Sequence, residues 1–149
     1  MPSSKGDIDA MTRTGSSRKA GREAGIKRLE MGRQYLKAAE TQYAMRDPGD
    51  FGNPVVSQCI LAAIAYADAV TIIFSGEESK ENHDAAPALL RAALGNRLPN
   101  GREKDFKMLL GLKPLAQYRA RSMTFEEAGK AMERLRAFAG WAEDMIASK

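Results

Sequence analysis

The side chains that could do chemistry lie in an apolar helix and in a basic segment that contains a proline. The apolar run, residues 55–74, reads VVSQCILAAIAYADAVTIIF and contains one carboxylate, Asp68. Leaving a carboxylate buried without a partner costs on the order of several kcal/mol. Asp68 therefore needs a counterion or a hydrogen-bond donor, and we expect a site, if the chain has one, to begin there.

The basic segment supplies candidates for that partner. Residues 102–121 hold six Lys or Arg against two Asp or Glu. The side chains of interest in this segment are Lys113, Tyr118, Arg119 and Arg121. We expect Asp68, Lys113 and Tyr118 to form a polar groove or a buried network. In such a groove Tyr118 can stack on a base and the cations can bind phosphate, which favours RNA or a nucleotide as the ligand. The alternative is a solvated basic face, with Lys113 or Tyr118 pairing with Asp68 for stability alone.

His83 is the only histidine and Cys59 the only cysteine, so a multi-histidine metal site or an internal disulfide cannot form within the chain. No glycine-rich phosphate loop is present, and we expect neither a metal nor a cofactor. If His83 meets Asp68, the carboxylate would orient the imidazole and raise its pKa. Otherwise His83 caps a helix or lies at the surface. The catalytic candidates, should there be catalysis, are His83, Tyr118, Arg119 and Arg121.

The periodicity predicts five helical segments and no strand, hence an all-α antiparallel up-and-down bundle of four to five helices. The expected helices cover residues 22–45, 53–74, 84–94, 102–121 with a break at Pro114, and 124 to about 146. Thr124 and Glu127 have the spacing of a capping box, and Asp84 is the expected N-cap of the third helix. Residues 77–82 are expected to be a loop.

Residues 1–21 form a different region from the bundle domain, residues 22–149. Residues 1–28 hold seven Lys or Arg against three Asp or Glu, while the remainder is neutral. The composition of residues 1–21 predicts a flexible basic arm, which either binds nucleic-acid phosphates or acts as a solubilising tail. We expect a cytoplasmic protein, because no signal-peptide pattern is present and the long apolar run is interrupted by polar residues.

The order of these features resembles the HEPN superfamily, helical bundles named for nucleotide binding in higher eukaryotes and prokaryotes. The resembling stretches are 62–69 (AAIAYADA), 82–86 (NHDAA) and 109–118 (LLGLKPLAQY), followed by a capped last helix. The resemblance covers residues 24–146 and implies an HEPN-like fold. Apart from the resemblance, the alanine-rich second helix and the glycine-bearing first helix allow helix backbones to approach closely. The apolar face of a bundle of this size often exceeds what one chain can cover, so we also expect a homodimer through the first, second or last helix.

Active members of that family are metal-independent ribonucleases that carry an Arg followed four to six residues later by His. Here no histidine follows Arg119 or Arg121. The resemblance therefore implies a non-catalytic module that binds a nucleotide, RNA or a protein partner of nucleotidyltransferase or antitoxin type. The alternative is a divergent ribonuclease of toxin type that uses Tyr118 or His83 with Arg119 or Arg121. A third hypothesis is DNA binding through the basic arm.

Overall fold

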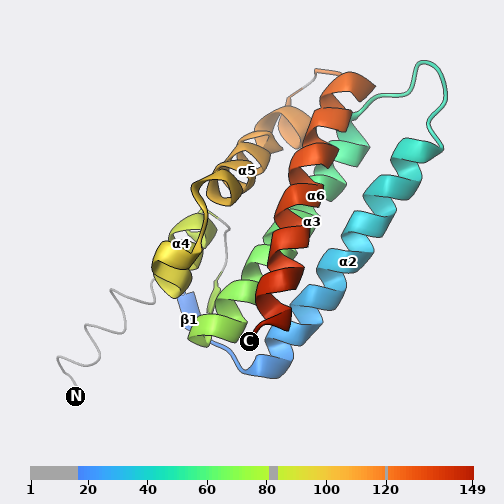
Figure 1. Ribbon diagram of the computed structural model, residues 1–149. Coiled ribbons are helices and arrows are strands. Elements are labelled where there is room, and N and C mark those ends of the chain that lie inside the picture. The colour runs from blue at the N-terminus through green and yellow to red at the C-terminus, as the bar shows by residue number, and fades with distance from the viewer. Residues whose placement is uncertain (1–16, 81–83, 120) are drawn as a thin grey trace.

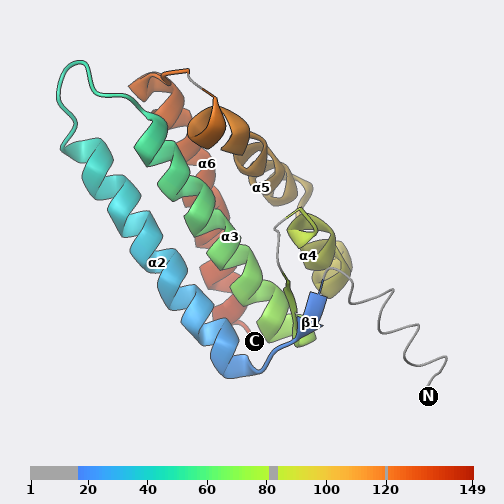
Figure 2. The same cartoon turned by 180° about the vertical axis from the view of Figure 1, so that it is seen from behind.

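The longest apolar segment of the sequence forms the centre of the structure, a computed structural model that describes residues 17–80, 84–119 and 121–149. The described elements are β1 (Ser17–Lys19), α2 (Arg22–Ala44), α3 (Asn53–Ser75), β2 (Glu77–Ser79), α4 (Ala86–Leu94), the 3₁₀ turn η1 (Gly95–Arg97), α5 (Asn100–Gly111), the π-helical turn η2 (Pro114–Tyr118) and α6 (Phe125–Ala147). Helix α3 lies between the other helices, with α2, α6 and the α4–α5 pair around it (Figures 1 and 2).

Helix α3 is apolar because it is enclosed. Between Val55 and Ile73 only Ser57, Gln58 and Leu61 are more than slightly exposed. The helix is long and apolar enough to cross a membrane by length and composition, yet 83% of its apolar window is buried inside the protein. A helix covered in this way is typical of a bundle core.

Two glycines allow α2 to pack closely against α3. A Cβ at Gly25 would lie 2.7 Å from Cγ1 of Ile73, and one at Gly32 would lie 2.9 Å from Cδ2 of Tyr66. These contacts run in opposite directions along the two helices, so α2 and α3 are antiparallel. The prediction that the glycine-bearing first helix approaches its neighbour closely is confirmed.

The local signals at Pro114 and Thr124 are also confirmed. Pro114 opens the η2 turn, in which the Arg119 N–H donates to the Pro114 carbonyl at 3.0 Å, so the regular helix ends as proline requires. The Glu127 N–H donates to Oγ1 of Thr124 at 3.1 Å, and the Thr124 N–H donates to Oε1 of Glu127 at 2.9 Å. This is the reciprocal capping box.

The expectation of no strand is wrong. Residues Ser17–Lys19 pair antiparallel with Glu77–Ser79, with Ser17 opposite Ser79 and Lys19 opposite Glu77. Strands of three residues are too short to show an alternating pattern. Part of the expected arm is therefore a strand of this ribbon, part of the expected loop is its partner, and residues 1–16 lie outside the described residues. The third helix begins at Ala86 with Ala85 as its N-cap, so Asp84 is not the N-cap.

The close packing of α2 and α3 predicts the effect of Gly32→Ala. The added methyl group would press on the Tyr66 ring, which is buried and whose hydroxyl lies 3.3 Å from Oε2 of Glu143. We expect a loss of about 1–3 kcal/mol in the free energy of unfolding, measured by denaturant titration. The control is Gly140→Ala, where a Cβ meets nothing within 4 Å; its better helix propensity should stabilise by up to about 1 kcal/mol. Equal stabilisation by both variants would contradict the close packing.

Candidate functional site

Asp68 is buried, as the sequence predicts, but its counterion is different from the expected one. The carboxylate is 3% exposed and its Oδ2 lies 3.7 Å from Nη1 of Arg28, on α2. Nη2 of Arg28 lies 3.4 Å from Oε1 of Glu78, on β2, and Nε of Arg18 lies 2.7 Å from Oε2 of the same carboxylate. Asp68 thus belongs to a chain of ion pairs that joins the central helix, α2 and the ribbon.

The expected pairing of Asp68 with Lys113 or Tyr118 is wrong. The side chain of Asn53, in the first turn of α3, donates to the carbonyls of Ala116 at 3.4 Å and Arg121 at 3.0 Å. The proline segment therefore packs on the first turn of α3. Asp68 is fifteen residues further along, which is about 22 Å at 1.5 Å per residue. Tyr118 is 72% exposed, so it is not the buried partner of a core carboxylate.

Burial raises the pKa of Asp68 from 3.8 to about 7. Desolvation is the largest cause, Arg28 acts in the opposite direction, and Glu78 adds to the increase. At 3.7 Å, the Arg28 contact is too long for a hydrogen bond that would offset the desolvation. Asp68 therefore titrates near neutral pH as a core group beside the ribbon.

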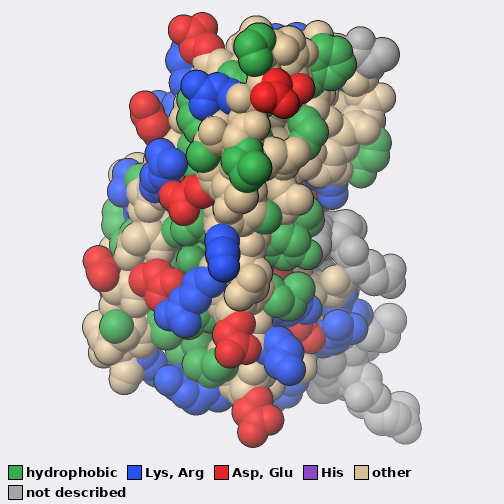
Figure 3. Space-filling view, turned by 90° about the vertical axis from the view of Figure 1, so that its right-hand side faces the viewer, with side chains coloured by type: hydrophobic (Ala, Val, Ile, Leu, Met, Phe, Trp, Pro, Cys, Tyr) green, Lys and Arg blue, Asp and Glu red, His purple; other side chains and the backbone are tan. Residues whose placement is uncertain are grey.

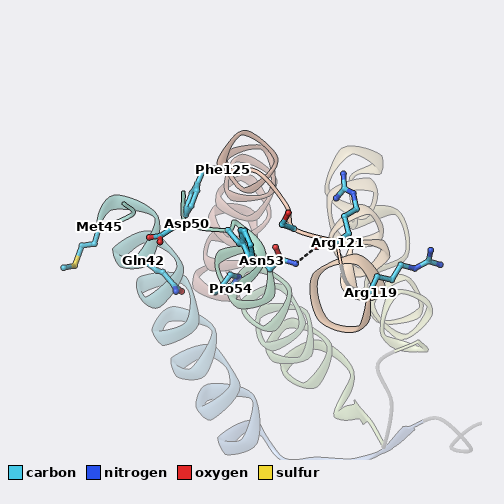
Figure 4. Close-up of a pocket in the computed structure, with 10 residues that line it drawn as sticks. Gln42, Met45, Asp50, Asn53, Pro54, Arg119, Arg121 and Phe125 are labelled. Atoms are coloured by element: carbon cyan, nitrogen blue, oxygen red, sulfur yellow. Dashed lines mark hydrogen bonds between the residues drawn. The ribbon is translucent and has the colours of Figure 1, made fainter. Parts of the chain in front are cut away.

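The basic candidates meet instead at the opposite end of the bundle. A groove of about 940 Å³ lies there, which we call the loop-end groove. Its apolar lining residues are Met45, Phe51, Pro54 and Phe125, and its polar lining residues are Gln42, Asp50, Asn53, Arg119, Arg121 and Ser122. The groove thus collects the end of α2, the loop to α3, the start of α3 and the segment before α6 (Figure 4).

The backbone that carries the two arginines is fixed by the start of α3. Besides the two bonds that it donates, the Asn53 side chain accepts a hydrogen bond from the Met123 N–H at 2.7 Å. The Gly52 N–H donates to the Met123 carbonyl at 2.7 Å, and a Cβ at Gly52 would collide with the Thr124 carbonyl oxygen. Sequence reasoning missed this role, because Asn53-Pro54 is typical of a helix start and gives no information on a distant partner.

The two arginines differ in their partners. Nη2 of Arg121 lies 2.7 Å from Oε2 of Glu127, whereas among the described residues Arg119 has no ion pair. Both side chains leave the rim of the groove in different directions (Figure 4). A third guanidinium, that of Arg46, lies over the Tyr43 ring at 4.4 Å from its centroid. Arg119 is therefore the cation at this end with the most freedom to bind an anion.

Large hydrophobic side chains are unusually exposed at the same end. Met45 is 75% exposed, Tyr118 72% and Phe51 62%, while no other exposed large hydrophobic among the described residues exceeds 41%. Hydrophobic side chains are visible beside charged ones at the top of Figure 3, the end where the loop-end groove lies. Clustered exposed apolar side chains are a common mark of a binding surface.

Of the candidate acid–base groups, Asp68 and Tyr118 lie far apart, and His83 lies outside the described residues. Among the described residues no group of three or more His, Cys, Asp or Glu side chains could hold a metal ion. Lys113 directly precedes η2 and does not line the loop-end groove.

Comparison of the chain with protein-family models, with curated proteins and with solved structures finds no match.

The raised pKa of Asp68 predicts a pH-dependent stability. Because the folded state holds this proton more tightly than the unfolded state does, the stabilisation is complete below about pH 4 and is lost as the pH rises to about 7. The slope reaches at most about 1.4 kcal/mol per pH unit. In Asp68→Asn the free energy of unfolding should lose this decline between pH 4 and 7, measured by denaturant titration at each pH. Parallel profiles for the wild type and the variant would contradict the assignment.

Proposed function

We propose that this protein is a non-catalytic binding module that takes single-stranded RNA or a nucleotide at the loop-end groove. The observation that carries the proposal is that Met45, Phe51 and Tyr118, the most exposed large hydrophobic side chains in the part of the chain that the structure describes, share one end of the bundle with Arg119 and Arg121. Aromatic rings and arginines are the two kinds of side chain that unpaired nucleotides require, one for the bases and the other for the phosphates.

Each kind of side chain supports a distinct part of the binding. Stacking of a base on an exposed ring such as Phe51 or Tyr118 contributes about 1–3 kcal/mol and does not depend strongly on the base. Arg119 and Arg121 can each contact a phosphate, although Arg121 must share its charge with Glu127. The hydrogen bonds of Asn53 and Gly52 hold the arginine-bearing segment in place before the ligand arrives, which lowers the entropic cost of binding.

The proposal includes an HEPN-like fold and a dimeric assembly. The order of helical segments and the break at Pro114 support an HEPN-like bundle. Because the chain lacks a histidine four to six residues after Arg119 or Arg121, we propose binding without catalysis. We further propose that the protein is a cytoplasmic homodimer. It would act in a regulatory pair with a protein partner of nucleotidyltransferase or antitoxin type.

Fluorescence anisotropy with a labelled single-stranded oligouridine tests the ligand. We expect the double variant Arg119→Gln/Arg121→Gln to raise Kd by at least about tenfold, since each charged hydrogen bond contributes about 1.5–3 kcal/mol. The negative slope of the logarithm of the binding constant against the logarithm of the salt concentration should become shallower by about 1.4, because two phosphate contacts on a single strand are lost. The matched control is Arg136→Gln, an exposed arginine on α6 paired with Glu40 away from the groove. Unchanged affinity and salt slope in the double variant would reject the proposal.

The rings need their own variants. Phe51→Ala and Tyr118→Ala should each weaken binding by about fivefold or more without changing the salt slope, because stacking involves no counterion release. Tyr118→Phe keeps the ring and should bind like the wild type. If the same oligonucleotide is cleaved by the wild type and stays intact with Tyr118→Phe, the divergent ribonuclease is the correct reading and the binding module is not.

A further inference from the structure

A second groove is lined by residues of α5 and α6 and by Leu112 and Met123. It has a volume of about 730 Å³ and runs between α5 and α6. Its polar lining includes Arg102 and Asp105 of α5 and Arg134 of α6, and its apolar lining includes Met108 and Leu112. None of these residues lines the loop-end groove. We call it the α5–α6 groove.

Asp105 holds two arginines at this groove. The carboxylate is 7% exposed, and its Oδ1 accepts a hydrogen bond from Nη1 of Arg134 at 3.2 Å. Its Oδ2 lies 3.0 Å from Nε of Arg102, yet neither of these two buried atoms makes a hydrogen bond within the protein, so this contact is an ion pair without directed bonding. Arg102 is therefore attracted to Asp105 without using its N–H groups there.

The two guanidinium groups offer more donors than Asp105 can use. Each guanidinium has five N–H donors, and one carboxylate neutralises only one of the two charges. Both arginine side chains are 34% exposed and line the groove. The cluster of Arg102, Asp105 and Arg134 thus presents a net positive charge with unused donors in the fork geometry that matches carboxylate and phosphate.

The remaining charges around the α5–α6 groove do not cancel this cluster. Lys130 and Glu133 are exposed on α6 and are opposite in sign. Glu127 is already engaged, by Arg121 at 2.7 Å and by the N–H of Thr124 at 2.9 Å. The cluster of Arg102, Asp105 and Arg134 therefore sets the sign of the charge in the groove.

An apolar wall lies beside the cations. Met108 is 41% exposed although it is a large hydrophobic residue, and Leu112 is half-buried next to it. Met123 closes the floor and is 2% exposed. A methionine wall adapts to varied apolar shapes. The groove is also within the usual size range of small-molecule sites, about 300–1,000 Å³.

We propose that the α5–α6 groove binds a small organic anion. Its carboxylate or phosphate monoester is held by Arg102 and Arg134, and its apolar body lies against Met108 and Leu112. Asp105 is a positioning residue that keeps both guanidinium groups at the groove. The site is independent of the loop-end groove and of RNA binding there.

Isothermal titration calorimetry with 1-naphthyl phosphate, 2-naphthoate and inorganic phosphate tests this proposal. We expect both naphthyl compounds to bind, and 1-naphthyl phosphate to bind at least about tenfold more tightly than inorganic phosphate, which lacks the apolar body. Arg134→Gln and Arg102→Gln should each raise Kd for the naphthyl compounds by at least about tenfold. Two separate variants are used so that the test stands if one of them folds poorly, which the melting profile of each variant without ligand will show.

Two controls separate this site from other arginines. Arg136→Gln removes a guanidinium from α6 outside the groove and should leave Kd within about twofold of the wild type. Arg119→Gln removes the cation of the loop-end groove that has no ion pair among the described residues and leaves the Arg121–Glu127 pair intact, so it should also leave this Kd unchanged. The proposal is overturned if neither naphthyl compound binds at millimolar concentration, if inorganic phosphate binds as tightly as 1-naphthyl phosphate, or if Arg102→Gln and Arg134→Gln bind like the wild type.

Discussion

The enclosure of α3 is the constraint on which the rest of the structure depends. Burying its apolar side chains removes them from water, which stabilises the fold by about 25 cal/mol for each Å² buried. One short helix cannot cover such a surface, so α2, α6 and the α4–α5 pair must all pack on it. Gly25 and Gly32 let α2 approach closely enough to cover one side of it. The arrangement of the other helices around α3 follows from this requirement.

Two polar residues of α3 then determine what assembles at each end of the bundle. Asp68 is enclosed with the apolar residues and is met by Arg28, which also links to Glu78 on the ribbon. Asn53, in the first turn, uses its amide to hold the backbone that carries Arg119 and Arg121. The acid in the core is thus tied to the ribbon, whereas the candidate binding surface depends on a neutral amide at the other end.

The helices could be predicted because their signals are local. Apolar periodicity, the capping box at Thr124 and the break at Pro114 depend on residues a few positions apart. The β ribbon could not be predicted in this way, since three-residue strands have no periodicity and β1 and β2 are separated by the whole of α2 and α3. A buried partner for Asp68 could be expected from physical chemistry, but many cations were available and the sequence does not say which one packs against α3.

The candidate binding surface was predictable only in part for the same reason. The basic segment identified Arg119, Arg121 and Tyr118, and these residues do lie at one exposed end of the bundle. Met45, Phe51 and Asn53 were not identified, because their proximity to that segment arises from the antiparallel packing of α2 and α3. Asp68 was grouped with Lys113 and Tyr118 as a possible partner, and the geometry separates Asp68 from that segment.

The most direct test of the central claim, that the loop-end groove is where this protein binds RNA, is photocross-linking of a uridine-rich single strand to the wild-type protein, with the modified residues identified by mass spectrometry. Cross-links should concentrate on Phe51 and Tyr118, since short-wavelength ultraviolet light joins bases to rings in stacking contact. Cross-links confined to the ribbon end of the bundle, or an absence of cross-linked peptides from residues 45–54 and 114–125, would contradict the account.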